Sequence, residues 1–170
     1  MSKSEQGIFT DRYQIIPRVL VFIVEDDSIL LLKGAPNKRL WANRYNGVGG
    51  HVEKGEDVYG AVIREIHEET GLCIQKLKLC AITMIDAGQP VGIGMYVFRA
   101  NYQGGAIINS DEGTLEWIPL SAIQNVELVE DLPVLIPAVL ALDDQDEPLS
   151  ILYTYDEQDH LMISIHGNRS

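Results

Sequence analysis

One segment limits most strongly what this chain can form. Residues 57–70 have the spacing of an amphipathic helix that begins at Asp57, a residue type that caps helix starts, and ends before Gly71. Three glutamates of this helix fall within about 100° of arc. They are Glu65, Glu68 and Glu69. Carboxylates at these spacings repel one another, and they stand near the helix C-terminus, where the helix dipole disfavours negative charge.

A divalent cation would turn this repulsion into binding, because Mg²⁺ selects carboxylate and carbonyl oxygens. Taken alone, the glutamates are more typical of a solvated helix face, but the flanking residues favour a site. Three glycines before the helix allow the backbone to approach a ligand and to turn a carbonyl toward a metal. They are Gly47, Gly49 and Gly50. Arg64 can pair with Glu56 and so hold the preceding loop against the helix.

The spacing of these residues forms a longer motif. Gly50 is followed after five residues by Glu56 and after seven more by the segment Arg64-Glu65-Ile66-His67-Glu68-Glu69-Thr70-Gly71-Leu72. This order resembles the Nudix signature GX5EX7REUXEEXGU at every specified position, and a looser resemblance extends over residues 17–142. It implies a Nudix α/β/α sandwich with a mixed central sheet. It also implies an enzyme that cleaves a phosphoanhydride bond with Mg²⁺ or Mn²⁺.

The resemblance also implies the roles of the site residues. In the family, the glutamates at positions 65, 68 and 69 bind the catalytic ions. The carbonyl of Gly49 is a further ligand, and a glutamate from a later loop, here Glu112, completes the site. We expect Glu65 to be the general base, with Glu112 as the second candidate. Arg64 is expected to orient the loop of Glu56.

The substrate assignment depends on residues outside this motif. Asn46 matches the base-contacting Asn of the MutT-type branch, which hydrolyses oxidised purine nucleoside triphosphates. In that branch an acidic residue near the position of Glu130 and Asp131 reads the purine edge. Gly50 and His51 complete the expected substrate-binding set. In contrast to some members, the chain has no aromatic residue near position 129 to stack on the base.

Several of these residues, and others that could serve the site, also have a purely structural explanation. Asn46 could cap a turn, and Glu130 and Asp131 could be acids that the dipole favours at a helix start. Trp117 fits a core position, and His51 fits an exposed strand position. Four basic residues could steer phosphate or belong to a solvated loop. They are Lys33, Lys38, Arg39 and Arg44.

The predicted reaction converts a nucleoside triphosphate, such as 8-oxo-dGTP, to a monophosphate and pyrophosphate. ADP-ribose or another nucleoside diphosphate derivative is the alternative substrate, and Pro90 keeps that option open because some ADP-ribose pyrophosphatases carry a proline near this distance from the motif. A non-catalytic nucleotide-sensing module of the same family is the third possibility. Such modules normally lose the glutamates, and all of them are present here.

Composition narrows the partners. Thirteen basic and 25 acidic residues give a formal net charge of −12, which disfavours binding to a nucleic acid polymer. A bound metal would allow an acidic protein to accept an anionic nucleotide. Cys73 and Cys80 lack metal-site spacing and are expected to be core residues in a reducing cytoplasm. No apolar run approaches the ~18 residues of a membrane span. We therefore expect a cytoplasmic protein with no membrane partner, and a homodimer remains open.

The pattern of the chain predicts three parts: an N-terminal arm over 1–16, the Nudix domain over 17–142, and an acidic C-terminal part over 143–170. In the C-terminal part, a β-hairpin of Leu149–Tyr155 and Leu161–Ile165 would extend the main sheet or pair with a partner, and a solvated acidic tail is the alternative. A second helix is expected over Leu132–Leu142. The other predicted strands are Val19–Val24, Ile29–Leu32, Val48–Glu53, Leu77–Ile85, Gly92–Ala100 and Leu115–Pro119.

Overall fold

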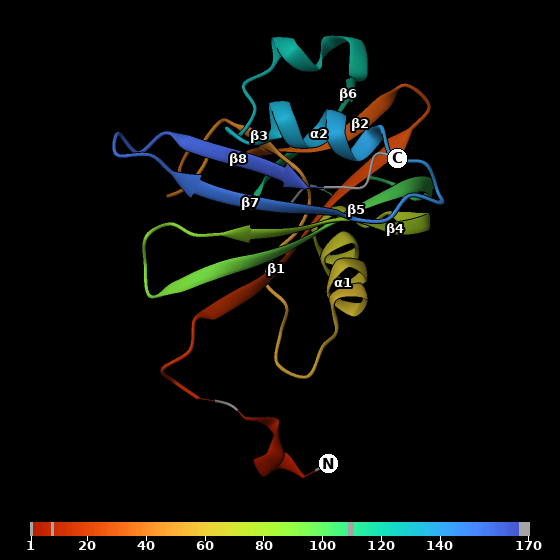
Figure 1. Ribbon diagram of the computed structural model, residues 1–170. Coiled ribbons are helices and arrows are strands. Elements are labelled where there is room, and N and C mark those ends of the chain that lie inside the picture. The colour runs from red at the N-terminus through yellow and green to blue at the C-terminus, as the bar shows by residue number, and fades with distance from the viewer. Residues whose placement is uncertain (1, 8, 109–110, 167–170) are drawn as a thin grey trace.

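A computed structural model describes residues 2–7, 9–108 and 111–166. It contains a mixed eight-stranded sheet between two helices (Figure 1), which confirms the predicted Nudix α/β/α sandwich. The helices are α1 (Val58–Thr70) and α2 (Leu132–Leu140), and short 3-10 helices cover Lys3–Gln6 and Leu120–Asn125. The strands are β1 (Gln14–Glu25), β2 (Ser28–Gly34), β3 (Tyr45–Asn46), β4 (Cys73–Ile85), β5 (Val91–Gly104), β6 (Gly113–Pro119), β7 (Leu149–Tyr155) and β8 (Leu161–His166).

The sheet combines both strand directions in the order β3-β2-β1-β5-β4-β7-β8, and β6 also pairs with β2. β1 is antiparallel to β2 and parallel to β5, and β5 is antiparallel to β4. The β1–β5 pairing begins with Gln14 opposite Val91. Residues 14–16, which the pattern placed in the N-terminal arm, therefore belong to the sheet. No helix in the described part of the chain is long and apolar enough to cross a membrane.

Helix α1 begins and ends where its local sequence predicts. The Asp57 carboxylate accepts hydrogen bonds from the backbone N–H groups of Tyr59 and Gly60, both at 2.9 Å, and Gly71 ends the helix at a φ of 70°. The helical spacing predicts one apolar face made of Val58, Tyr59, Val62, Ile63 and Ile66. This prediction was partly wrong, because Tyr59 and Ile63 are 47% and 56% exposed. The helix instead meets the sheet along a stripe rotated toward its glutamates. That stripe consists of Ala61, Val62, Ile66 and Thr70.

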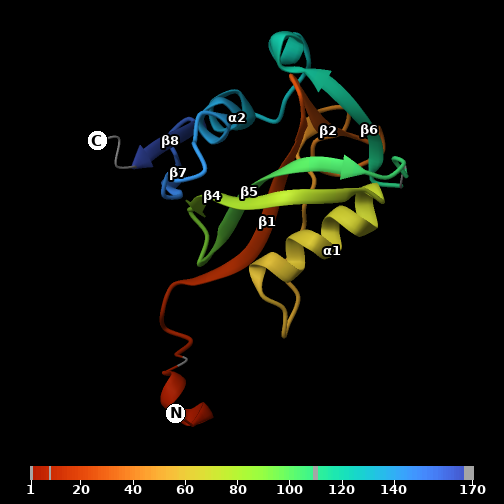
Figure 2. The same ribbon diagram turned by 90° about the vertical axis from the view of Figure 1, so that its right-hand side faces the viewer.

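Helix α2 covers the opposite face of the sheet (Figure 2). Its apolar residues pack against the side chains of Leu20 and Phe22 on β1. It ends at Leu140, two residues before the predicted end. Arg99 on β5 donates to the backbone carbonyls of Leu140 and Leu142, which lie at the helix end. A guanidinium from the sheet therefore satisfies carbonyls that the end of the helix leaves free.

Two local expectations were wrong. Residues 48–53 do not form a strand: Val48 and His51 make isolated bridges to β1. Of the two glycines between them, Gly49 has a φ of 154° and lies so close to β1 that a Cβ on it would be 2.2 Å from the carbonyl oxygen of Val19. Cys80 is buried as expected, but Cys73 is exposed at the start of β4.

The C-terminal hairpin is present and belongs to the main sheet. β7 pairs parallel with β4, and β8 pairs antiparallel with β7. Alternation explains this placement, since Ile151 and Tyr153 point into the core beneath α2 while Leu152 is exposed. The described part of the acidic segment thus includes two ordered strands of the sheet.

Candidate active site

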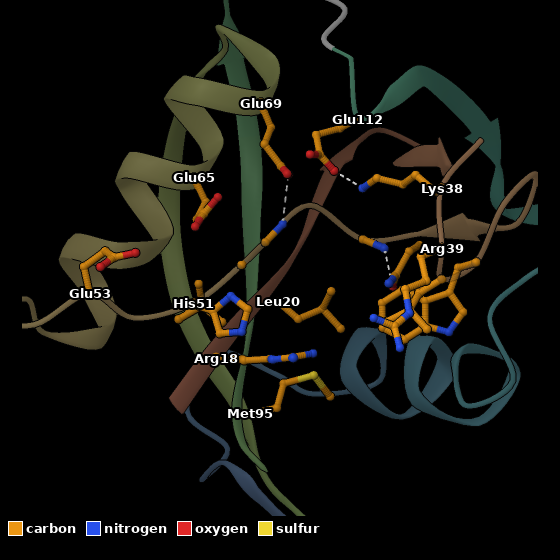
Figure 3. A pocket seen from close by; sticks show the side chains of 17 residues that line it. Arg18, Leu20, Lys38, Arg39, His51, Glu53, Glu65, Glu69, Met95 and Glu112 are labelled. Carbon is orange, nitrogen blue, oxygen red and sulfur yellow. Dashed lines mark hydrogen bonds and ion pairs between the residues drawn. The ribbon is translucent and has the colours of Figure 1, made fainter. Parts of the chain in front are cut away.

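A cavity of about 580 Å³ lies between α1, the glycine-rich segment (residues 47–51) and the loop that follows β2 (Figure 3). Seven predicted site residues line it, and they come from three stretches of the chain: residues 46–51, helix α1 and the loop before β6. They are Asn46, Gly49, Gly50, His51, Glu65, Glu69 and Glu112. Glu68 is not among the residues that line this cavity, and its side chain is 57% exposed. The fold therefore brings together most of the residues that the motif placed near the metal.

Arg64 organises the acidic side of the cavity. Its Nε and Nη2 donate to the two carboxylate oxygens of Glu56 at 3.0 and 3.1 Å, as predicted. The same guanidinium donates to Glu65 at 2.9 Å, to Glu68 at 3.1 Å and to the carbonyl of His51 at 2.9 Å. The pKa of Glu56 lies below its ordinary value, mainly because of the hydrogen bond from Arg64. One side chain thus connects the loop, two glutamates and the glycine-rich segment.

Glycines permit the close approach of this segment to α1. A Cβ on Gly50 would lie 2.3 Å from a carboxylate oxygen of Glu65, so only glycine fits at this position without moving that glutamate. The backbone N–H of Gly49 donates to Glu69 at 3.1 Å (Figure 3). The Glu65 side chain, of which 12% is exposed, therefore lies directly against the segment that reaches the cavity.

Glu69 is mostly buried, and burial raises its pKa to about 7. Because the folded value exceeds the ordinary value of 4.5, the folded protein holds this proton more tightly than the unfolded chain. The associated stability is fully present below about pH 4.5 and is lost as the pH rises through about 7. In EDTA, the free energy of unfolding should fall by about 3 kcal/mol as the pH rises from about 4.5 to 7, because Glu69 loses its proton at a lower pH in the unfolded chain than in the folded protein.

Urea unfolding at pH 5 and pH 8 measures this effect. Glu69→Gln should remove this part of the pH dependence and stabilise the metal-free protein at pH 8. Glu147→Gln, an exposed residue of the loop before β7, is the matched control and should keep the wild-type profile. A Glu69→Gln profile parallel to wild type would contradict the expected titration.

The donor set fits a hard divalent cation. The predicted ligands are carboxylate and carbonyl oxygens, and Glu69 is a mostly buried acid that accepts a hydrogen bond from the neutral N–H group of Gly49. Within the described residues, no three acidic, His or Cys side chains converge closely enough to hold an ion by themselves. Each carboxylate is instead turned toward a protein donor: Glu65 pairs with Arg64, and Glu112 pairs with Lys38.

A second cavity of about 220 Å³ adjoins the first on the α2 side of the sheet. Asn46 lines both cavities, and Glu130 and Asp131 line the second. The Asn46 side chain also accepts from the N–H of Gly47 at 2.8 Å, so the turn-capping explanation holds together with the cavity position. Asp131 stands at the N-cap of α2 but makes no capping bond. Its carboxylate accepts from the hydroxyl of Tyr153 at 3.1 Å, and burial raises its pKa.

Several lining residues lie outside the sequence motifs. The C-terminal hairpin contributes Tyr153, Tyr155 and Leu161 to the second cavity, so aromatic side chains are present although none lies near position 129. Arg18 and Trp41 line both cavities. The alternation of apolar and polar residues along β1 and β7 indicates which side chains point inward, but it does not indicate which strands pair.

The basic residues and Trp117 have separate positions. Lys38 and Arg39 line the first cavity, and Arg44 lines a smaller adjoining one of about 100 Å³. Lys33 lies over the ring of Tyr45, 5.4 Å from its centroid. Trp117 packs against the core on the α1 side, as the structural explanation predicted.

Comparison with known proteins agrees with this geometry. The family model for the NUDIX domain matches residues 15–139. The oxidized purine nucleoside triphosphate hydrolase of Mus musculus is 30% identical over 122 residues, which cover 71% of this chain and 77% of that protein. The NAD-capped RNA hydrolase NudC of Escherichia coli is 34% identical over 129 residues, 75% of this chain and 45% of NudC.

Among solved structures, a MutT protein from Bacillus halodurans superposes with a TM-score of 0.73 at 23% identity, covering 92% of this chain and 99% of that one. This similarity supports the fold. The family match spans most of the chain and contains the glycine-rich segment, Arg64 and the glutamates of α1. The chain therefore belongs to the Nudix family of phosphoanhydride hydrolases.

Proposed function

We propose that the protein hydrolyses a purine nucleoside triphosphate, with 8-oxo-dGTP preferred, to a monophosphate and pyrophosphate. The observation that carries the proposal is the meeting of two cavities at Asn46. The first holds glutamates suited to a metal–phosphate complex, and the second holds amide and carboxyl groups suited to a purine edge. The similarity to an oxidized purine nucleoside triphosphate hydrolase supports the same substrate class.

Mg²⁺ or Mn²⁺ is the proposed cofactor, held by Glu65, Glu68, Glu69 and Glu112 together with the carbonyl of Gly49. When bound, such an ion polarises the phosphoryl oxygens, neutralises charge that develops during cleavage and lowers the pKa of a coordinated water. Lys38 pairs with Glu112 at the cavity wall and adds positive charge beside the phosphates. The acidic site becomes compatible with an anionic substrate in this way.

Glu65 is the proposed general base, because its carboxylate lies in the cavity wall and Arg64 fixes its direction at 2.9 Å. In this role Glu65 accepts the proton of the attacking water at a carboxylate oxygen. Glu112 remains the second candidate, on the opposite wall of the same cavity (Figure 3). Gly50 and His51 line the same cavity and would lie along the phosphate chain.

Base recognition is assigned to the second cavity. Asn46 has both a donor and an acceptor, and Glu130 and Asp131 add carboxyl groups that face the same space. The raised pKa of Asp131, caused by burial, favours a carboxyl group that can hold a proton and donate it to a base. A site of this kind rejects an analogue that leaves its buried polar groups unpaired.

Two variants test base recognition. Asn46→Ala and Asp131→Asn should each reduce the preference for 8-oxo-dGTP over dATP, measured as a ratio of kcat/KM, by roughly 10-fold. The physical reason is the loss of one hydrogen-bonding group from a desolvated site. Asp11→Asn, an exposed change in the N-terminal arm, is the matched control and should leave the ratio unchanged.

The same measurements include ADP-ribose as the rival substrate. A higher kcat/KM for ADP-ribose than for 8-oxo-dGTP would reject the triphosphate assignment and leave only the hydrolase class. An unchanged base preference in both variants would reject the assignment of the second cavity to the base.

A further inference from the structure

Arg18 stands at the junction of the two cavities. It lines both of them, together with Leu20 and Asn46. Figure 3 shows the Arg18 side chain extending into the first cavity between Leu20 and Met95, on the side away from Glu69. Its guanidinium is therefore a positive group placed between the glutamates of one cavity and the polar groups of the other.

The register of the sheet explains how an arginine reaches this position. Arg18 lies opposite Met95 on β5 and points to the same face of β1 as Leu20 and Phe22. Leu20 and Phe22 pack into the core beneath α2. Arg18 is the next residue on this face toward the start of β1, and it lies at the cavities. The position that continues the apolar row thus carries a cation.

In the described part of the chain, the Arg18 guanidinium lacks the ion-pair partners that Lys38 and Arg64 have. Lys38 pairs with Glu112, and Arg64 is held by three glutamates. The Arg18 Nε atom is buried without a hydrogen-bond partner, and within the described ranges Arg18 forms no ion pair. A buried donor without a partner destabilises the folded protein, and arginine stays charged at every relevant pH. A purely structural role therefore does not account for it.

We infer that Arg18 binds the phosphate group attached to the nucleoside, the phosphate that remains on the monophosphate product. The inference rests on the proposed function, which places the base in the second cavity and the leaving pyrophosphate beside the glutamates. The group that connects them must pass the junction at which Arg18 lies. A phosphate offers the acceptor oxygens that a guanidinium binds in charge-assisted pairs. Arg18 is thus a specificity residue for nucleotides over free pyrophosphate.

Binding without metal tests this role apart from catalysis. The dissociation constants of 8-oxo-dGMP, dGMP, dAMP and dCMP are measured by calorimetry in EDTA for wild type, Arg18→Gln and Arg18→Lys. Arg18→Gln should raise the dissociation constants of all four monophosphates by the same factor, roughly 10- to 100-fold, because it removes one charge-assisted contact to phosphate. Arg18→Lys should recover part of the loss, since it restores the charge without the planar pair of donors.

Two controls accompany the series. Arg12→Gln makes the same chemical change at an exposed position before β1 and should bind the monophosphates like wild type. The inhibition constant of pyrophosphate should be unchanged in Arg18→Gln, because pyrophosphate occupies the glutamate side. The urea midpoint of Arg18→Gln should equal or exceed that of wild type, since the variant loses a buried donor without a partner.

The outcomes separate this inference from the proposed function. A loss confined to guanine nucleotides would overturn the inference and assign Arg18 to the base edge. Unchanged monophosphate binding, or no measurable binding by wild type, would also overturn it. Equal wild-type affinity for all four bases, with a uniform loss in Arg18→Gln, would support Arg18 as a phosphate ligand while the proposed base preference fails.

Discussion

Replacing Glu65 with Gln is expected to lower kcat by roughly 10²- to 10⁴-fold, the range for loss of a general base. The substitution keeps the volume of the side chain beside Gly50, and the amide oxygen can still accept the hydrogen bond from Arg64. The variant should therefore fold with a urea midpoint close to wild type. Pyrophosphate release from 8-oxo-dGTP with Mg²⁺, measured at saturating substrate, gives kcat directly.

The control for this experiment is Glu157→Gln, which removes the same charge from the exposed turn of the C-terminal hairpin and should keep full activity. A kcat for Glu65→Gln within a few-fold of wild type would reject Glu65 as the base, and Glu112→Gln would then be the decisive variant. Wild-type activity that persists in excess EDTA would contradict the metal-dependent mechanism as a whole.

Arg64→Ala should reduce kcat by about 100-fold and lower stability at the same time, although Arg64 is not expected to touch the reacting atoms. Five hydrogen bonds from its guanidinium hold Glu56, Glu65, Glu68 and the carbonyl of His51 in one arrangement. Without them the glutamates and the glycine-rich segment lose their relative positions. Activity and urea unfolding of the same preparations measure both effects.

A double-mutant cycle tests whether this coupling is the cause. The double variant Glu56→Ala/Arg64→Ala should lose much less activity and stability, as free energies, than the sum of the two single losses. The reason is that either change alone breaks the same pair. Arg64→Ala combined with Asp144→Ala serves as the matched control, since Asp144 pairs with Arg99, near the end of α2, and the losses should add. Simple additivity of the Glu56 and Arg64 losses would mean that the pair does not position the site.

Local sequence signals determined much of the catalytic half of the fold. The bounds of α1 follow from Asp57 and Gly71, whose capping interactions involve only near neighbours. Helical spacing alone places Glu65 and Glu69 on one side of the helix. The pair of Arg64 with Glu56 is also local, because it joins two residues only eight positions apart. Alternation likewise revealed the hairpin of β7 and β8. The apolar face of α1 was predicted only in part, because the tilt of a helix on a sheet depends on the partner surface.

The tertiary structure alone decided which of these parts meet. The parallel pairings of β1 with β5 and of β7 with β4 join segments that are distant in the chain, and alternation does not specify a partner strand. These pairings bring Arg18 and Tyr155 to the cavities beside Asn46. The raised pKa of Glu69 is likewise a tertiary property, since burial causes it. The sequence by itself thus determined the glutamate helix and the family, because their signals act within one turn or loop. Only long-range packing determined the second cavity and the unpaired guanidinium of Arg18 where the two cavities meet.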